Sequence, residues 1–232
     1  MCRKHFALVF AVVLVIAFAG CGIKQLLPSK KVPPLDDYNT VLLLPFELDN
    51  PPQEYKTLPT QISYAIGTKM KVRHEKKTLV YDQSQEVSPV SKKLKEIGMS
   101  AKGTFMDPLA STSKLVEAFG ADLIIAGKMD KPKFTREDSG KITYDMKDSS
   151  ARGAARYYTV YQTATLPANI KIIDAKKNEI IWEGKVIGYK KYATRYLTGS
   201  PKKFQRDETM MADIRRDLVQ KLVDKLYPVQ EG

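Results

Sequence analysis

Two short runs in this chain are almost continuously apolar, and they set the class of fold that the chain can adopt. The first is TVLLLPF at residues 40–46, and the second is ADLIIAGKM at residues 121–129. A strand whose residues are apolar without alternation is buried on both faces of its sheet, so layers must cover it on each side. The runs therefore predict strands of an α/β sheet with helices packed against it.

Helical patterns lie between and after these runs. The first begins near Pro59, because apolar residues recur there every four positions from Leu58 to Met70. Ser88-Pro89 predicts a second helix that Gly98 ends, and Asp107-Pro108 predicts a third that Gly120 ends. The apolar stripe of this third helix is expected to be Leu115, Val116 and Phe119. A long fourth helix is expected over residues 211–226, ended by Pro228.

The second half of the chain predicts strands. Ile142, Tyr144 and Met146 alternate with polar residues, as do residues 156–165, which predicts a hairpin across KDSSARG. Residues 169–174 and 179–187 predict a second hairpin across AKKN. The basic and aromatic stretch 189–203 contains Gly199-Ser200-Pro201 and predicts a loop. We therefore expect one three-layer α/β domain, residues 39–228, with a mixed central sheet flanked by helices.

The N-terminus has the pattern of an export signal. A basic leader precedes an uninterrupted apolar run at residues 6–19, which is shorter than the roughly 20 residues that a membrane-spanning helix needs. Phe18-Ala19-Gly20-Cys21 then resembles the lipobox of bacterial lipoproteins, although leucine is usual where Phe18 stands. The resemblance implies a signal peptide at residues 1–20 and a diacylglycerol-bearing, palmitoylated Cys21. The alternative is an uncleaved anchor with an incidental cysteine.

The residues after Cys21 predict a flexible tether at 21–38, rich in Pro, Lys and Ser. Gly22 resembles the sorting signal of outer-membrane lipoproteins, so a periplasm-facing lipoprotein of the outer membrane is expected. The formal net charge of the chain is +12, which suggests an anionic partner. For an exported lipoprotein, an acidic envelope protein, a cell-wall polymer or anionic lipid fits better than nucleic acid. A basic surface that only aids solubility is the alternative.

Catalytic and cofactor motifs are missing from the sequence. After signal cleavage His74 would be the one histidine, and there is no H-E-x-x-H, C-x-x-C, G-x-S-x-G or phosphate-binding glycine motif. Asp107, Asp122, Asp130 and Asp174 stand at the ends of predicted elements, where aspartate usually caps a helix or begins a turn. We therefore predict no enzyme activity, no cofactor and no metal site. A glycosidase-type carboxylate pair, and with it a cell-wall-acting enzyme, remains the remote alternative.

Several segments together resemble one superfamily. VLLLPF followed by TQISYAI, then FGADLIIAGKM, then IKIIDAKKNEIIWEGK resemble the CsgG-like lipoproteins, the TolB amino-terminal domain and the LpoB-like activators of penicillin-binding proteins. In the last segment Asn178 replaces the frequent glycine of the turn, and asparagine also tolerates a left-handed backbone. The resemblance implies a three-layer α/β domain that serves assembly rather than catalysis.

We therefore expect a lipid-anchored scaffold that docks a partner in envelope assembly or secretion, with a homo-oligomer possible. The expected partner surfaces are the 141–166 hairpin and the 189–203 loop with the phenylalanine that follows it, unless that loop is only a solvated connection. Arginine and aromatic residues are enriched at interface hot spots. The residues chosen on this basis are Tyr144, Tyr158, Lys190, Lys191, Tyr192, Arg195, Tyr196, Lys202, Lys203 and Phe204.

The alternative is a subunit of an oligomeric secretion pore. In a pore the hairpin would present Tyr158, Val160, Ala164 and Leu166 to lipid. Arg156 and Gln162 interrupt that same face, whereas an outer-membrane strand needs about ten residues of apolar alternation.

Overall fold

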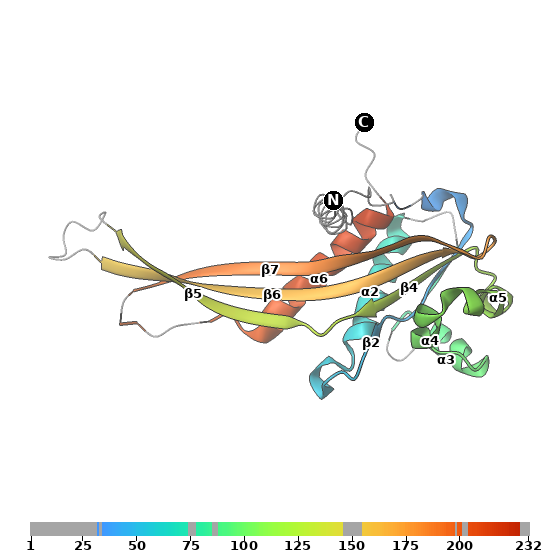
Figure 1. Ribbon diagram of the computed structural model, residues 1–232, viewed down its shortest axis with the longest axis horizontal. Helices are drawn as coiled ribbons and strands as arrows, with labels where there is room; N and C mark the ends of the chain where they lie inside the picture. Colours follow the sequence, from blue (N-terminus) through green and yellow to red (C-terminus); the bar gives the residue numbers. More distant parts are fainter. Residues whose placement is uncertain are drawn as a thin grey trace, which may run out of the picture. The chain divides into compact units, whose positions relative to one another are not determined.

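The computed structural model describes residues 32, 34–73, 78–84, 88–145, 155–197, 199–200 and 204–227 (Figure 1). The predicted signal peptide, Cys21, His74, Lys202 and Lys203 lie outside the described residues. The elements in chain order are η2 (Leu35–Asp37), β1 (Thr40–Leu43), β2 (Glu47–Leu48), η3 (Gln53–Tyr55), α2 (Leu58–Arg73), β3 (Thr78–Val80), α3 (Pro89–Glu96), α4 (Ala101–Met106), α5 (Pro108–Phe119), β4 (Leu123–Met129), β5 (Lys133–Asp145), β6 (Ala155–Asp174), β7 (Glu179–Leu197) and α6 (Asp207–Leu226).

The strands form one mixed sheet, as the sequence predicts. β1 lies between β3 and β4 and is parallel to both, and the two-residue β2 is also parallel to β4. β6 is antiparallel to β4, to β5 and to β7. The parallel part corresponds to the two apolar runs of the sequence, and the antiparallel part corresponds to the alternating segments after Asp130.

Helices cover both faces of the parallel part, and the alternation of side chains assigns each residue to a face. Val41 and Leu43 of β1 belong to the core beneath α2 and α6. Leu42 and Leu44 belong to a second core beneath α3, α4 and α5. The apolar character of TVLLLPF at successive positions follows from this arrangement, because each of its two faces meets a different layer of helices.

Local signals placed most helices correctly. Leu58, Ile62, Ile66 and Met70 are all buried on α2. Asp107 caps α5 by accepting a hydrogen bond from the backbone of Ala110, and Pro108 is its first residue. Gly120 then ends α5 in a left-handed conformation, with φ at +63°.

Three details of the packing and of the helices differ from what the sequence predicts. Val116 is exposed rather than buried on α5, whereas Leu115 is buried as predicted and Thr112 also faces the core. The short helix α4 was not predicted, because its six residues are too few for an apolar period to emerge. The packed core also reaches back into the predicted tether, to Leu35 and Tyr38, which are only 2% and 9% exposed.

β6 is one strand of 20 residues, where the sequence predicted two strands belonging to two hairpins. Its neighbour on one side changes along its length: residues 155–165 pair with β5, and residues 168–174 pair with β4. Pro167 stands between the two predicted strands and lies where β5 gives way to β4 as the neighbour of β6. A proline is tolerated at a gap in a strand ladder because no hydrogen bond from its nitrogen is needed there.

The β6–β7 turn has the structure that its sequence predicts. The Asp174 carboxylate accepts hydrogen bonds of 3.0 Å from the backbone N–H groups of Lys176 and Lys177. Asn178 takes the left-handed conformation, with φ at +52°. Trp182 on the return strand is buried, at 3% exposed.

Candidate interaction surface

The stretch predicted as a loop is mostly strand. β7 continues to Leu197 and pairs with β6 in an unbroken register from Gly188 opposite Leu166 to Leu197 opposite Tyr157. Lys190, Lys191, Tyr192, Arg195 and Tyr196 are therefore strand residues. Basic residues made this stretch look like a loop, but the long pairing with β6 satisfies its backbone, and such tertiary pairing outweighs local propensity.

Because β7 is a strand, its side chains divide between two faces of the β5–β6–β7 sheet. We call the face that packs on α6 the inner face and the opposite one the outer face. Residues paired across antiparallel strands share a face. The outer face consists of Tyr157, Thr159, Tyr161, Thr163, Thr165, Ile187, Tyr189, Lys191, Ala193, Arg195 and Leu197.

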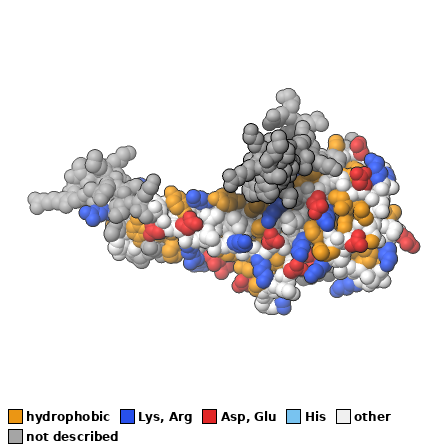
Figure 2. Space-filling view, viewed as in Figure 1, with side chains coloured by type: hydrophobic (Ala, Val, Ile, Leu, Met, Phe, Trp, Pro, Cys, Tyr) orange, Lys and Arg blue, Asp and Glu red, His pale blue; other side chains and the backbone are white. Residues whose placement is uncertain are grey.

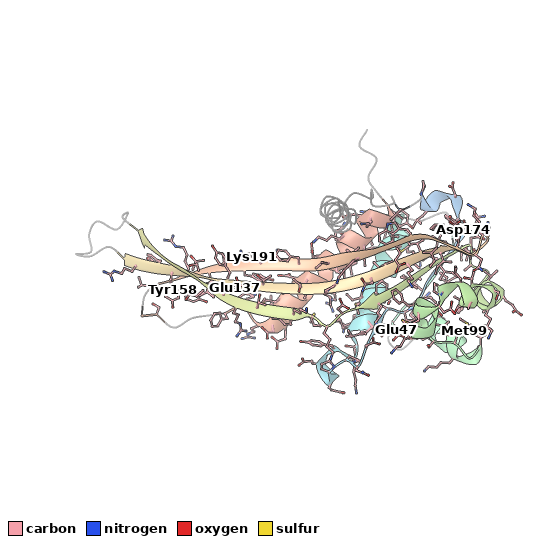
Figure 3. All side chains as sticks on the ribbon, in the orientation of Figure 1. Glu47, Met99, Glu137, Tyr158, Asp174 and Lys191 are labelled. Atoms are coloured by element: carbon pink, nitrogen blue, oxygen red, sulfur yellow. The ribbon has the colours of Figure 1, made fainter. Side chains whose placement is uncertain are left out.

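The outer face is open to solvent. All six of its β7 residues are exposed, including the apolar Ile187 at 43%, Tyr189 at 45% and Leu197 at 44%. Lys191 and the neighbouring Glu137 of β5 lie along this ribbon in Figure 3. In Figure 2, basic and acidic side chains alternate over the visible surface without forming a large area of one sign. The outer face thus combines a small excess of positive charge with exposed apolar area.

Two cations on the outer face lie over tyrosine rings. The Lys191 Nζ is 4.1 Å from the ring centroid of Tyr161, and the Arg195 Cζ is 4.7 Å from that of Tyr157. Both contacts run diagonally between β7 and β6, and they recur four residues apart on each strand. An exposed cation–π contact contributes about 0.5–1 kcal/mol. These contacts hold the two charges in defined positions on the sheet.

The other predicted aromatic residues belong to the inner face or lie near it. Tyr196 is 6% exposed and stacks on Tyr158, with ring centroids 5.7 Å apart, while Phe204 meets Tyr196 edge-on at 6.3 Å. The Tyr192 hydroxyl is hydrogen-bonded to Asp213 of α6. Burial, and then this hydrogen bond, raise the pKa of Tyr192 to about 12. These rings join the ribbon to the rest of the domain.

The predicted partner residues are therefore not one cluster. Lys191 and Arg195 share the outer face, and Lys190 is exposed on the same strand face as Tyr192. Tyr144 lies on β5 opposite Arg156. Sequence reasoning missed Tyr157, Tyr161 and Tyr189, although the alternation of tyrosine and threonine from 157 to 165 was the available signal.

The face assigned to lipid in the pore alternative is part of the core in this fold. Val160, Ala164 and Leu166 are 4% exposed or less and lie on the inner face. Gln162, which interrupts their apolar pattern, is 1% exposed. Its side chain accepts a 2.7 Å hydrogen bond from the backbone of Gln205 and donates a 3.2 Å bond to the carbonyl of the same residue. The polar interruption therefore fastens the chain segment that leads into α6.

The carboxylates noted in the sequence accept hydrogen bonds at a turn and at the ends of strands. Asp122 accepts hydrogen bonds from the backbone of Asn39 and Thr40. Asp174 also accepts a 3.1 Å bond from the Tyr38 hydroxyl. Burial draws the pKa of Asp174 upward, but the bonds from Lys177 and Tyr38 outweigh it and leave the pKa lowered. These contacts join the start of β1 to the residue before β4, and the segment before β1 to the β6–β7 turn.

In the described ranges, no three histidine, cysteine, aspartate or glutamate side chains come together as a metal site would require. Among the helices that the structure describes, none combines the length and the apolar character of a membrane span. The absence of enzyme activity stays a prediction.

No protein-family model matches the chain, and no curated protein matches it either. Solved structures similar to it include the hypothetical protein CT253 from Chlamydia trachomatis, with a TM-score of 0.43, 12% identity, and coverage of 82% of this chain and 98% of that one. Lipoprotein GNA1162 from Neisseria meningitidis has a TM-score of 0.38 at 13% identity, covering 81% and 96%.

The LpoB C-terminal domain from Salmonella enterica has a TM-score of 0.30 at 15% identity, covering 64% of this chain and 81% of that one. At such identities the similarity concerns the fold alone. A structure of an LpoB domain is thus among those similar to the chain, whereas the resemblance to CsgG-like proteins and TolB stays a prediction.

Proposed function

We propose that this chain is a lipid-anchored, periplasm-facing lipoprotein of the outer membrane that docks a partner in envelope assembly or secretion. The observation that carries the proposal is the outer face, where Tyr189, Lys191 and Arg195 are exposed together on a rigid sheet. Tyrosine and arginine are the residue types most enriched at interface hot spots. The sequence pattern that ends in Cys21 supports the anchor.

The physical properties of the outer face favour a partner that is partly acidic and partly apolar. Lys191 and Arg195 lie over tyrosine rings, which lowers the side-chain freedom that they lose when they contact an anionic group. Ile187 and Leu197 add apolar area at intervals along the same strand. A surface built on paired strands also presents these groups in fixed positions.

Cross-linking of the full chain in membranes tests the proposal. Reversing both charges, in Lys191→Glu with Arg195→Glu, should lower recovery of the cross-linked partner about tenfold, because both contacts become repulsive. Lys114→Glu, at an exposed position on α5, is the matched control and should leave recovery unchanged. Wild-type recovery from the double variant would refute the assignment of this face.

The anchor is tested separately with Cys21→Ala. The variant should move from the membrane fraction to the soluble fraction and should still bind the partner identified above, since the two sites are distinct. Retention of Cys21→Ala in the membrane would contradict the lipid anchor without affecting the docking surface.

A further inference from the structure

A groove opens on the α6 side of the sheet, away from the outer face. It lies between η3, the first turns of α2 and the first turns of α6, and it has a volume of about 280 Å³. Its apolar walls come from Leu58, Phe134, Met211 and Ala212. Pockets for drug-sized ligands span roughly 300–1,000 Å³, so this groove suits one or two side chains rather than a cofactor.

The rim of the groove is acidic, although the chain as a whole is strongly basic. Glu54, Asp207 and Glu208 contribute three carboxylates and Arg215 contributes one guanidinium, so the groove lining has a net negative charge. Arg206 lies outside this lining, in a shallower hollow beside Asp207 and Glu208. Asp207 forms a salt bridge of 3.1 Å with Arg136. The Arg215 guanidinium of α6 donates a hydrogen bond to the Gln61 side chain of α2. In the part of the chain that the structure describes, neither Glu54 nor Glu208 forms an ion pair.

The tyrosine beside the rim reports the same negative charge. Tyr55 lines the groove beside Glu54 and Asp207. Burial raises the pKa of Tyr55, and the nearby carboxylates of Glu54 and Asp207 raise it further. These two carboxylates therefore act on the same part of the groove.

The rim has a partial structural explanation. Asp207 and Glu208 occupy the first turn of α6, where acidic residues interact favourably with the helix dipole. That preference does not account for Glu54, which comes from η3 on the other side of the groove. It also does not account for Phe134 and Met211, which remain partly exposed beside the buried Leu58.

We propose that this groove accepts a lysine or arginine side chain of a partner protein. The methylene stem would lie along Leu58, Phe134 and Met211, and the charged end would reach Glu54 and Glu208. Basic side chains commonly bury their stems in this way while the charge stays at the rim. The proposal rests on charge complementarity and is independent of the outer face.

Methyl NMR on the full chain in detergent micelles tests the proposal. The probes are acetyl-Leu-Arg-Leu-amide and its glutamine counterpart acetyl-Leu-Gln-Leu-amide, and the reporter is the Met211 methyl resonance, assigned with Met211→Leu. The arginine peptide should shift this resonance saturably, with an affinity about fivefold higher than that of the glutamine peptide, as expected for two exposed charge contacts.

Charge-neutral variants complete the test. Glu54→Gln with Glu208→Gln should weaken binding of the arginine peptide about fivefold. Both positions are exposed, so the fold should be kept, with only the small loss of the Glu208 interaction with the α6 dipole. Glu117→Gln, exposed on α5, is the matched control. Equal binding of the two peptides, or no shift at Met211, would overturn the proposal.

Two other occupants are covered by the same experiment. A Met211 shift that depends on protein concentration without peptide would assign the groove to a second copy. A shift caused by Lys30→Gln with Lys31→Gln, again without peptide, would assign it to the N-terminal segment of the chain itself. Either result overturns the proposal of a partner side chain.

Discussion

Gly188 determines how closely α6 can approach β7. A Cβ added there would lie 2.3 Å from the carbonyl oxygen of Ile214 and 2.9 Å from the Cβ of Leu218. Because the nearest atom belongs to the helix backbone, α6 as a whole would have to shift. The absence of a side chain at this one position thus sets the distance between two elements.

Gly188→Ala should therefore lower the free energy of unfolding by about 1–3 kcal/mol, the range typical of overpacking. Urea denaturation measures the change. Gly103→Ala is the matched control, since a Cβ added there would meet only the Ser100 hydroxyl, at 3.3 Å, and no atom of a neighbouring element within 4 Å. An unchanged midpoint for Gly188→Ala would contradict the close approach of α6.

The hydroxyl of Tyr38 links stability to alkaline pH. Burial, the hydrogen bond to Asp174 and the charges of Asp174 and Asp37 raise the pKa of Tyr38 to about 12. An ordinary tyrosine ionises near pH 10, so between about pH 10 and 12 the unfolded state loses this proton first. The unfolded state then binds fewer protons than the native state, and stability falls as the pH rises.

Tyr38→Phe should remove this part of the alkaline loss, about 2 kcal/mol between pH 10 and 12. The measurement is the free energy of unfolding of both proteins across that range, with Tyr64→Phe on the exposed side of α2 as the control. Parallel pH curves for wild type and Tyr38→Phe would argue against a protected Tyr38 hydroxyl.

At the scale of elements, the packing of α6 on the ribbon depends on a buried amide. Gln162 bonds both the N–H and the carbonyl of Gln205, directly before α6 begins. Gln162→Leu should cost about 1–3 kcal/mol, because these backbone groups lose their partner in a partly buried site. Amide hydrogen exchange should show faster exchange at Gln205.

Thr163→Val, one residue along the strand and on the outer face, is the control for Gln162→Leu and should leave exchange at Gln205 unchanged. If the two variants behaved alike, the amide would not be what holds this segment.

An element can be predicted from the sequence when the residues that determine it lie close to it in the chain. α2, α3 and α5 were found because proline, aspartate and glycine act within a few residues of each helix end. The two halves of β6 were predicted as strands, but their continuity and the second half of β7 were missed because β6 and β7 stabilise each other by pairing. Lysine-rich and proline-containing segments became strands through a partner elsewhere in the chain.

At the scale of the whole molecule, the three-layer α/β class was predictable because two apolar runs required cover on both faces. The candidate surface was only partly predictable. Lys191 and Arg195 were selected for charge, but their assignment to one face depends on the register with β6. The groove could not be predicted, since Glu54, Phe134 and Glu208 are distant in sequence and meet only through the packing of α2 and α6.

The shared strand β6 has a mechanical consequence. Its 20 residues span about 66 Å at roughly 3.3 Å each, from the pairing with β5 to the pairing with β4. Hydrogen bonds between strands lie perpendicular to the strand direction, so a pull along β6 loads them simultaneously in shear. Force applied by a docked partner along the ribbon would therefore reach the parallel core directly, because β6 runs as one continuous strand from the ribbon to its pairing with β4.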